Sequence, residues 1–232
     1  NPSMVTTDQP AYGYLSPPIG VMSLAAYLRA RGIATEVLDL CTRPIDELES
    51  RLADFRPSLV GISCMSANAA FAHELARRVK AAGDTPVVFG GPHASILPDA
   101  VMEHPEVDYV VMGEGETPLV ALASAIDENT PVDRIPGLGY RVDGRVVYNR
   151  RPAPLVVDSL PFPAYDVLDN DVYIEYGERY QGFRHLVAIV SRGCPGRCTF
   201  CAQRLTMGSR FRAFAPRRLV GELASLAETY GV

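Results

Sequence analysis

The sequence predicts an α/β protein whose first part is a doubly wound parallel sheet. Helical and strand patterns alternate between residues 19 and 126, glycines follow two of the helical patterns, and several strand patterns are continuous apolar runs. A continuous apolar run is typical of a strand that helices cover on both faces, as in a parallel sheet. The alternation and the apolar runs therefore indicate the same fold class.

The alternation starts with a helix at Ile19, because Val21, Leu24 and Leu28 recur at helical spacing and Gly32 suits the helix end. In chain order, the next predicted elements are a strand over 34–40, a helix over 45–55, a strand over 58–63, a helix over 69–82 before Gly83, strands over 86–89 and 108–112, and a helix over 118–126. This order is that of a doubly wound, Rossmann-like sheet.

The pattern changes after this domain. Residues 138–142 and 145–148 flank Asp143-Gly144, a pair that predicts a β-hairpin. Four prolines between residues 150 and 165 predict an extended linker that lies over a domain surface. We therefore expect the sheet to be followed by a hairpin and a proline-rich connection.

The last part has the pattern strand, loop, helix. Residues 185–191 are an apolar run typical of a buried strand, and Pro216 fits the first turn of a final helix. The apolar face expected for that helix comprises Leu219, Val220, Leu223, Leu226, Ala227 and Tyr230. The predicted parts are a front domain over 1–127, a hairpin and linker over 128–184, and a final unit over 185–232. Both ends are expected to be cuts in a longer protein, because the chain opens without a methionine and stops where another strand could begin.

The composition narrows the class of protein, its partners and its cellular location. The chain is 47% hydrophobic and 21% charged, as globular proteins are, and its net charge of −5 gives no general electrostatic case for a nucleic-acid partner. No apolar run approaches the ~20 residues that span a bilayer, and no signal peptide precedes the fold. We therefore expect a cytoplasmic protein, whose five cysteines a reducing setting keeps free for metal.

Three of these cysteines, Cys194, Cys198 and Cys201, stand on one loop between the last predicted strand and helix. Cysteine thiolates hold iron–sulfur clusters, and three at this spacing can bind three irons of a four-iron cluster and leave the fourth open. A structural zinc site normally has four closed ligands, and no fourth cysteine or histidine lies in the loop. A zinc-binding interaction module, completed by a partner's ligand, is the alternative.

The loop follows an apolar strand, and Phe200 stands immediately before Cys201. Here the sequence resembles the radical S-adenosylmethionine (SAM) superfamily, whose Cys-x3-Cys-x-aromatic-Cys loop follows the first strand of a partial (β/α) barrel. The resemblance covers residues 185–232. It implies that Cys194, Cys198 and Cys201 hold a 4Fe-4S cluster, that SAM binds the open iron near Phe200, and that SAM cleavage gives a radical. It also implies a small-molecule substrate and an external electron donor such as flavodoxin or ferredoxin.

Arginines surround the motif, and no acidic residue lies between positions 204 and 218. The arginines are Arg204, Arg210, Arg212, Arg217 and Arg218. They are either a basic rim for a cofactor carboxylate or anionic substrate, or the solvated charges of a loop and helix start.

Three loops at the carboxyl ends of predicted strands are candidates for ligand binding, since ligands bind at that edge of an open α/β sheet. The candidate residues are Ser63, Met65, Gly90, Gly91, Pro92, His93, Glu114, Gly115, Glu116 and Thr117. Paired glycines let a flat ligand approach the backbone, and hydroxyls bond its polar edges. A nucleotide fingerprint fits poorly, because 113–118 lacks the third glycine and its glutamates would repel a pyrophosphate. Alternatively, these residues only form turns and helix caps.

Four segments in order, 17–20, 37–39, 90–93 and 113–117, resemble the cobalamin-binding domain of cobalamin-dependent radical SAM enzymes, and the linker Pro161-Phe162-Pro163 also fits. The resemblance spans nearly the whole chain. It implies a corrin over the carboxyl edge of the sheet that faces the cluster across a shared cavity, with its nucleotide tail near Ser63 and Gly90-Gly91.

One feature departs from classical cobalamin domains, which carry Asp-x-His-x-x-Gly after their first strand. The matching stretch, 1–20, contains no histidine. We therefore expect no histidine ligand to cobalt from this loop, and His93, on a different loop, is a poor substitute.

The resemblance implies a methyltransferase that acts on an unactivated carbon or a phosphinate centre. The alternative within the class is a radical SAM cyclase, oxidoreductase or rearrangement enzyme without methyl transfer. Methylthiotransferases of transfer RNA resemble the chain at the cluster loop but bring three further cysteines in front of it. Here only Cys41 and Cys64 are available, and buried structural thiols are the better interpretation of both.

Overall fold

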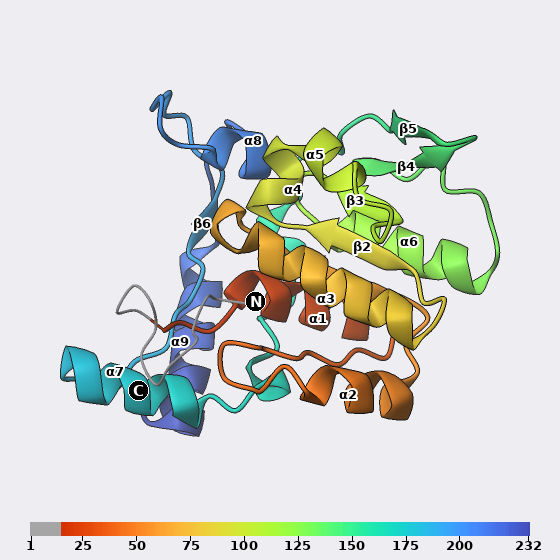
Figure 1. The fold of residues 1–232 in the computed structure, drawn as a ribbon. Helices are drawn as coiled ribbons and strands as arrows, with labels where there is room; N and C mark the ends of the chain where they lie inside the picture. Colours follow the sequence, from red (N-terminus) through yellow and green to blue (C-terminus); the bar gives the residue numbers. More distant parts are fainter. Residues whose placement is uncertain (1–14) are drawn as a thin grey trace.

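The computed structural model describes residues 15–232 (Figure 1). Within them, the main sheet has five strands that lie side by side in chain order. They are β1 (Val60–Ser63), β2 (Val87–Gly90), β3 (Tyr109–Val111), β4 (Leu138–Val142) and β5 (Arg145–Tyr148). The first three are parallel, and β4 and β5 continue the sheet antiparallel. The carboxyl ends of β1, β2 and β3 therefore share one edge.

Helices connect and flank the strands. The α-helices are α1 (Ile19–Arg29), α2 (Glu47–Phe55), α3 (Ala69–Ala82), α4 (Pro92–Ile96), α5 (Pro98–Met102), α6 (Glu116–Asp127), α7 (Asp171–Gln181), α8 (Gln203–Met207) and α9 (Pro216–Tyr230). Short 3-10 turns are η1 (Ser66–Asn68), η2 (Val157–Ser159) and η3 (Tyr165–Val167). None of these helices is both long and apolar enough to cross a bilayer.

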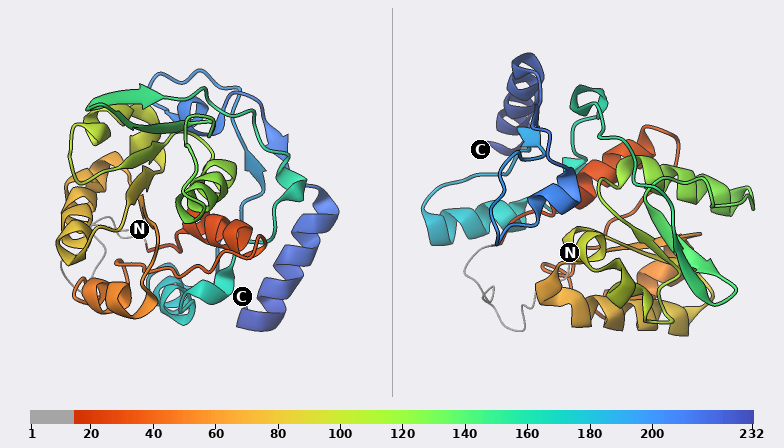
Figure 2. Two further views of the ribbon diagram at one scale, coloured as in Figure 1. Left: turned by 90° about the vertical axis from the view of Figure 1, so that its right-hand side faces the viewer. Right: turned by 90° about the horizontal axis from the view of Figure 1, so that it is seen from above.

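Helices cover both faces of the sheet, so the doubly wound prediction is confirmed (Figure 2). Phe89 of β2 points to one face, where it packs among residues of α3 with α2 alongside. Its neighbour Val88 points to the opposite face and packs with Leu122 of α6, beside which α1 lies. Successive strand residues face opposite sides, and a strand buried on both sides must be apolar throughout. This explains the continuous apolar runs of the sequence.

The turn predictions are confirmed. Gly32, just after α1, has a left-handed φ of 76°, which glycine adopts at no steric cost. In the hairpin between β4 and β5, Asp143 and Gly144 have φ of 49° and 76°. Positive φ at both central residues is what a type I′ turn requires. The hairpin belongs to the main sheet, where β4 pairs with β3.

Two predicted strands are wrong in whole or part. Residues 34–40 form no strand, although Leu38 and Leu40 pack against the core on the α3 side. Of the strand predicted over 185–191, only Ser191 is in a ladder, within β6 (Ser191–Arg192), which pairs with β7 (Arg212–Ala213). An apolar pattern reports burial, whereas a strand also needs a neighbour for its backbone hydrogen bonds. Residues 34–40 are in no ladder of the described chain.

Residues 128–184 are not only hairpin and linker. They include α7, which the sequence patterns did not predict because its buried side is narrow, with Tyr173 and Ile174 as its buried large residues. The final helix, α9, is confirmed. Its apolar face is only partly covered: Leu226 packs with Met22, while Val220 is 66% and Leu223 53% exposed.

Candidate cofactor site

The three candidate loops meet at the carboxyl edge of the sheet. Ser63 and Gly90 are register partners at the ends of β1 and β2. The amide of His93 donates to the carbonyl of Cys64 at 3.0 Å, and the amide of Gly113 donates to Ser95 Oγ at 2.9 Å. The first loop is thus bonded to the second and the second to the third, as the parallel order requires.

The glycines of these loops serve different needs. A Cβ on Gly91, whose φ is 89°, would lie 3.0 Å from the carbonyl oxygen of Cys64, so packing of the first two loops requires glycine there. A Cβ on Gly115 would lie 3.2 Å from Leu24 of α1. Gly90, in contrast, has no other protein atom within 4 Å of its missing Cβ. The protein's own packing therefore explains Gly91 and Gly115 but leaves open space beside Gly90.

Several of the other candidates in these loops are polar or exposed. Ser66 Oγ lies 2.9 Å from His93 Nδ1, and burial lowers the pKa of His93, which favours the neutral ring. Met65 is half exposed, and its amide donates to the Asn68 side chain at 2.8 Å. Pro92 opens α4 and Thr117 lies exposed in the first turn of α6.

The cysteine loop runs from β6 to β7 and returns to its starting point. Gly193, with φ of 79°, closes its base: a Cβ there would lie 2.1 Å from the carbonyl oxygen of Arg210. The amide of Cys194 donates to the carbonyl of Gly208 at 3.1 Å. Cys194 is half-buried, whereas Cys198 and Cys201 are exposed. All three are free thiols on one loop whose two ends are held together.

The spread of the sulfur atoms bears on the kind of metal centre. A Cβ on Gly196 would lie 3.3 Å from Cys194 Sγ and 3.7 Å from Cys198 Sγ, so two thiols flank this glycine. Among the described residues, the three cysteine Sγ atoms do not all lie within 4.8 Å of one another. One zinc ion, bound at ~2.3 Å, would bring thiolates to about 3.8 Å from each other. The donor type and its spread suit a cluster, in which each thiolate binds a different iron.

A cavity of about 530 Å³ opens between this loop and the front domain. Its lining includes Cys198 and Cys201 of the cysteine loop, Gly113 and Glu114 of the third loop, and linker residues 151–154. The volume is within the roughly 300–1,000 Å³ of small-molecule sites. The structure thus brings the third loop and the cysteines to one cavity.

The first two loops do not line this cavity, because α8 packs against α4 at this part of the edge. Arg151 holds the two helices together: its Nη1 donates to the carbonyl of Leu205 at 2.6 Å and its Nη2 to that of Ser95 at 2.9 Å.

Glu114 and Glu116, predicted as cofactor contacts, are engaged by two arginines. Arg192 Nη1 lies 3.2 Å from Glu114 Oε1 and its Nη2 lies 2.6 Å from Glu116 Oε1. Arg212 Nη1 lies 2.8 Å from Glu114 Oε2. All four side chains are only 4–9% exposed. Burial opposes the charged form of Arg192, but the two carboxylates raise its pKa overall. We call these four residues the ion quartet.

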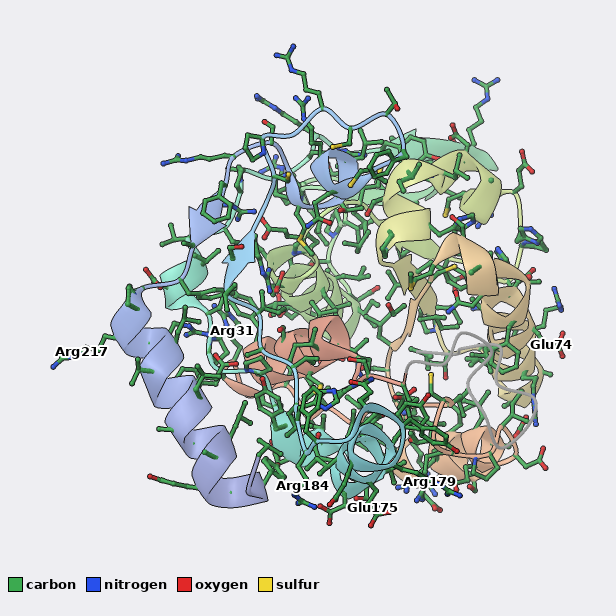
Figure 3. The ribbon with its side chains drawn as sticks, turned by 90° about the vertical axis from the view of Figure 1, so that its left-hand side faces the viewer. Arg31, Glu74, Glu175, Arg179, Arg184 and Arg217 are labelled. Atoms are coloured by element: carbon green, nitrogen blue, oxygen red, sulfur yellow. The ribbon has the colours of Figure 1, made fainter. Side chains whose placement is uncertain are left out.

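The arginines around the motif divide between the two interpretations. Arg204 and Arg197 line the cavity, as a basic rim would. Arg217 points outward from α9 (Figure 3), as a solvated charge does. Arg218 fits neither, because its guanidinium lies 4.6 Å from the Phe214 ring and donates to the carbonyl of Pro161 at 2.9 Å. The ion quartet and these contacts were not predictable from local sequence.

The remaining cysteines and histidines lie apart from the cavity. Cys64 is fully buried, as predicted, and burial raises its pKa to about 11. Cys41 was predicted to be buried too, but it is only half-buried. His73, His104 and Glu106 gather on the α3 side, with the two rings stacked at 3.7 Å. The two Nδ1 atoms lie 3.4 and 3.5 Å from Glu106 Oε1, so the three side chains form a close polar group away from the cavity.

Comparison with known proteins agrees with this geometry. Residues 11–123 match the family model described as the B12 binding domain. An uncharacterized methyltransferase of Pyrococcus horikoshii is 33% identical over 226 residues, which cover 95% of this chain and 48% of the relative. An anaerobic magnesium-protoporphyrin IX monomethyl ester cyclase of Synechocystis is 27% identical over 225 residues, or 93% of this chain and 44% of the relative. The chain thus spans about half the length of these relatives.

Solved structures share the fold. The radical SAM methyltransferase TsrM of Kitasatospora setae, with cobalamin and a 4Fe-4S cluster bound, has a TM-score of 0.76 at 24% identity over 92% of this chain and 43% of that chain. The same enzyme with tryptophan substrate and a SAM analogue has a TM-score of 0.73 at 26% identity over 91% of this chain and 43% of that chain. The fold and its loops define a B12-binding domain followed by a loop with three free cysteines. Over nearly its whole length, the chain is thus similar to radical SAM enzymes that bind cobalamin.

Proposed function

We propose that this chain is the cofactor-binding part of a radical SAM methyltransferase that acts on an unactivated carbon or phosphinate centre of a small molecule. The observation that supports this most is the cavity that Cys198 and Cys201 share with the third loop of the B12-binding domain. When bound, the cluster would supply the electron that cleaves SAM, and cobalamin would carry the methyl group. The protein would hold the cluster at this cavity and cobalamin along the adjoining carboxyl edge of the sheet, and would exclude water from both.

In this proposal, Cys194, Cys198 and Cys201 hold the cluster. Two of these thiols are exposed, so incoming iron reaches them without unfolding the loop. Phe200, which is 92% exposed beside Cys201, would contact SAM. At the base of the loop, the amide of Cys194 already donates a hydrogen bond to the carbonyl of Gly208, which keeps the loop from spreading when iron binds.

Cobalamin would lie along the carboxyl edge of the sheet, with Gly90 as its point of close approach. The predicted contacts are Ser63, Met65, Gly90, Gly91, Pro92, His93, Gly115 and Thr117. No histidine from 1–20 would bind cobalt; most of that stretch lies outside the described residues. His93 would keep its bond to Ser66 instead. A cobalt(II) paramagnetic resonance spectrum with nitrogen coupling from a protein imidazole would contradict this.

The cofactor assignment is tested by anaerobic reconstitution of the chain with iron, sulfide and hydroxocobalamin. We expect bound iron and cobalt in the wild type, and loss of iron but not of cobalt in Cys198→Ala. The matched control Cys41→Ala, outside the loop, should keep both. Stoichiometric zinc with no iron in anaerobically purified protein would overturn the proposal in favour of a zinc-binding interaction module.

The second candidate is a cyclase or oxidoreductase that uses the same cofactors without methyl transfer, and the identity to the Synechocystis cyclase favours it. SAM with a labelled methyl group, given to the full-length protein with its substrate, separates the two, since only a methyltransferase puts the label into product. We further propose a flavodoxin or ferredoxin as electron donor and a reducing cytoplasmic setting, which would keep the five cysteines reduced.

A further inference from the structure

We infer that Arg192 is a positioning residue. By binding both Glu114 and Glu116, it holds the base of the cysteine loop in a defined position against the B12-binding domain. This inference rests on the proposed function for its consequence, because the two parts of the chain that it aligns are those proposed to hold the cluster and cobalamin. The arginine itself does not line the cavity formed by the cysteines and the third loop.

Arg192 lies in the two-stranded ladder that closes the cysteine loop. Arg192 and Arg212 are direct cross-strand partners of β6 and β7, and the loop with all three cysteines runs between them. Like charges directly opposite each other destabilise a strand pair. Here Glu114 accepts from both guanidiniums, so a residue of the front domain completes the base of the cysteine loop.

The side chain of Arg192 contacts two glutamates at once. One planar guanidinium directs Nη1 to Glu114, in the loop between β3 and α6, and Nη2 to Glu116, the first residue of α6. Two N–H groups at fixed spacing define an orientation as well as a distance, which the single ammonium of lysine does not. The quartet holds two positive and two negative side chains, so its burial leaves no net charge.

The ion quartet serves to fix the position of the cysteine loop relative to the front domain more than to stabilise the fold. Replacing a buried ion pair by apolar residues is often neutral or stabilising, while fixing register is the best-attested use of such pairs. Glu114 itself lines the cavity, next to Gly113. A shift of Arg192 would therefore move one wall of the cavity relative to the other.

Arg192→Lys tests this, with Arg77→Lys as the matched control. Arg77 also joins two glutamates, Glu74 and Glu106, but it is half exposed and lies on α3 away from the cavity. In the unloaded chain, hydrogen exchange of the peptide 193–211 should accelerate about tenfold in Arg192→Lys, as loss of one charge-assisted hydrogen bond predicts. Exchange in β1 to β3 should stay unchanged, and Arg77→Lys should leave 193–211 unchanged.

The loaded chain gives the second readout. Pulsed paramagnetic resonance measures the distance between cobalt(II) and the reduced cluster, and we expect a broadened distribution in Arg192→Lys but not in Arg77→Lys. A lowered unfolding midpoint with unchanged exchange at 193–211 and an unchanged distance distribution would overturn the inference. If Arg192→Lys does not fold, Glu116→Gln, which removes one arm only, should give the same signature. A wild type that loads neither cofactor contradicts the proposed function, while the exchange experiment still decides the positioning role.

Discussion

The Tyr173 hydroxyl donates a hydrogen bond to the carboxylate of Asp39, and both side chains are buried. The bond ties α7 to residues 34–40, far away in the sequence. Burial, and then the neighbouring Asp39, raise the pKa of Tyr173, so its hydroxyl stays a neutral donor. Two elements that the sequence patterns did not predict correctly, α7 and 34–40, thus stabilise each other.

Removal of this hydroxyl should destabilise the fold. Tyr173→Phe leaves a buried carboxylate short of one donor, and we expect a loss of about 1–3 kcal/mol in the free energy of unfolding. Urea unfolding followed by circular dichroism measures it. Tyr180→Phe in the same helix removes an exposed hydroxyl and is the control. Equal effects of both changes would mean that the bond to Asp39 contributes nothing.

Glu114 should matter more to stability than an exposed glutamate with the same kind of partner. Glu114→Gln leaves two buried guanidiniums with one carboxylate, and breaking a buried ion pair costs about 3–5 kcal/mol. Glu74→Gln breaks an exposed pair with Arg77, for which we expect about 0–1 kcal/mol. Chemical unfolding of both variants compares the two losses. A Glu114→Gln protein as stable as Glu74→Gln would contradict the buried quartet.

The two neighbouring glycines of the second loop should respond differently to alanine. Gly91→Ala forces a positive φ on alanine and a contact with the Cys64 carbonyl, so we expect a loss of about 1–3 kcal/mol in stability. Gly90→Ala meets open space, so the fold should keep its stability while hydroxocobalamin binding weakens. Urea unfolding and a spectroscopic titration with hydroxocobalamin measure the two effects. Unchanged cobalamin affinity in Gly90→Ala would count against its proposed place beside the corrin.

Stability should fall below about pH 6.5 through His73. Burial, followed by the neighbouring His104, lowers the pKa of His73 in the folded state below its ordinary value of 6.5. The folded state therefore binds fewer protons there than the unfolded chain, so its contribution is complete above pH 6.5 and decreases as the pH falls towards the lowered value. His73→Phe keeps the ring against Phe89 and removes this titration.

Unfolding free energies of wild type and His73→Phe, measured from about pH 8 to about pH 5, check the direction. The wild type should lose stability relative to the variant only on the acid side. His93, whose pKa burial also lowers, is present in both proteins and cancels in the difference. Parallel pH profiles of the two proteins would refute the assignment to His73.

Much of the fold was predictable because it depends on local signals. The helix 69–82 has the predicted bounds, since its apolar residues recur every three to four positions and Gly83 follows. The hairpin was predictable because Asp143-Gly144 adopts positive φ at low cost. The strand predictions at 34–40 and 185–191 were less reliable, because an apolar run records burial but not the presence of a pairing neighbour.

The candidate site divides in the same way. The spacing of Cys194, Cys198 and Cys201 on a loop after an apolar run is a local pattern, and so are the glycines of the three loops, whose parallel order places them at one edge. These features follow from the order of residues along the chain. The contact between Arg192 and Glu114 follows from the folded arrangement, because the two residues are 78 positions apart and a charged residue has no periodicity that indicates its partner. The folded arrangement also determines that Gly91 serves packing while Gly90 faces open space, since identical residues differ only in what surrounds them.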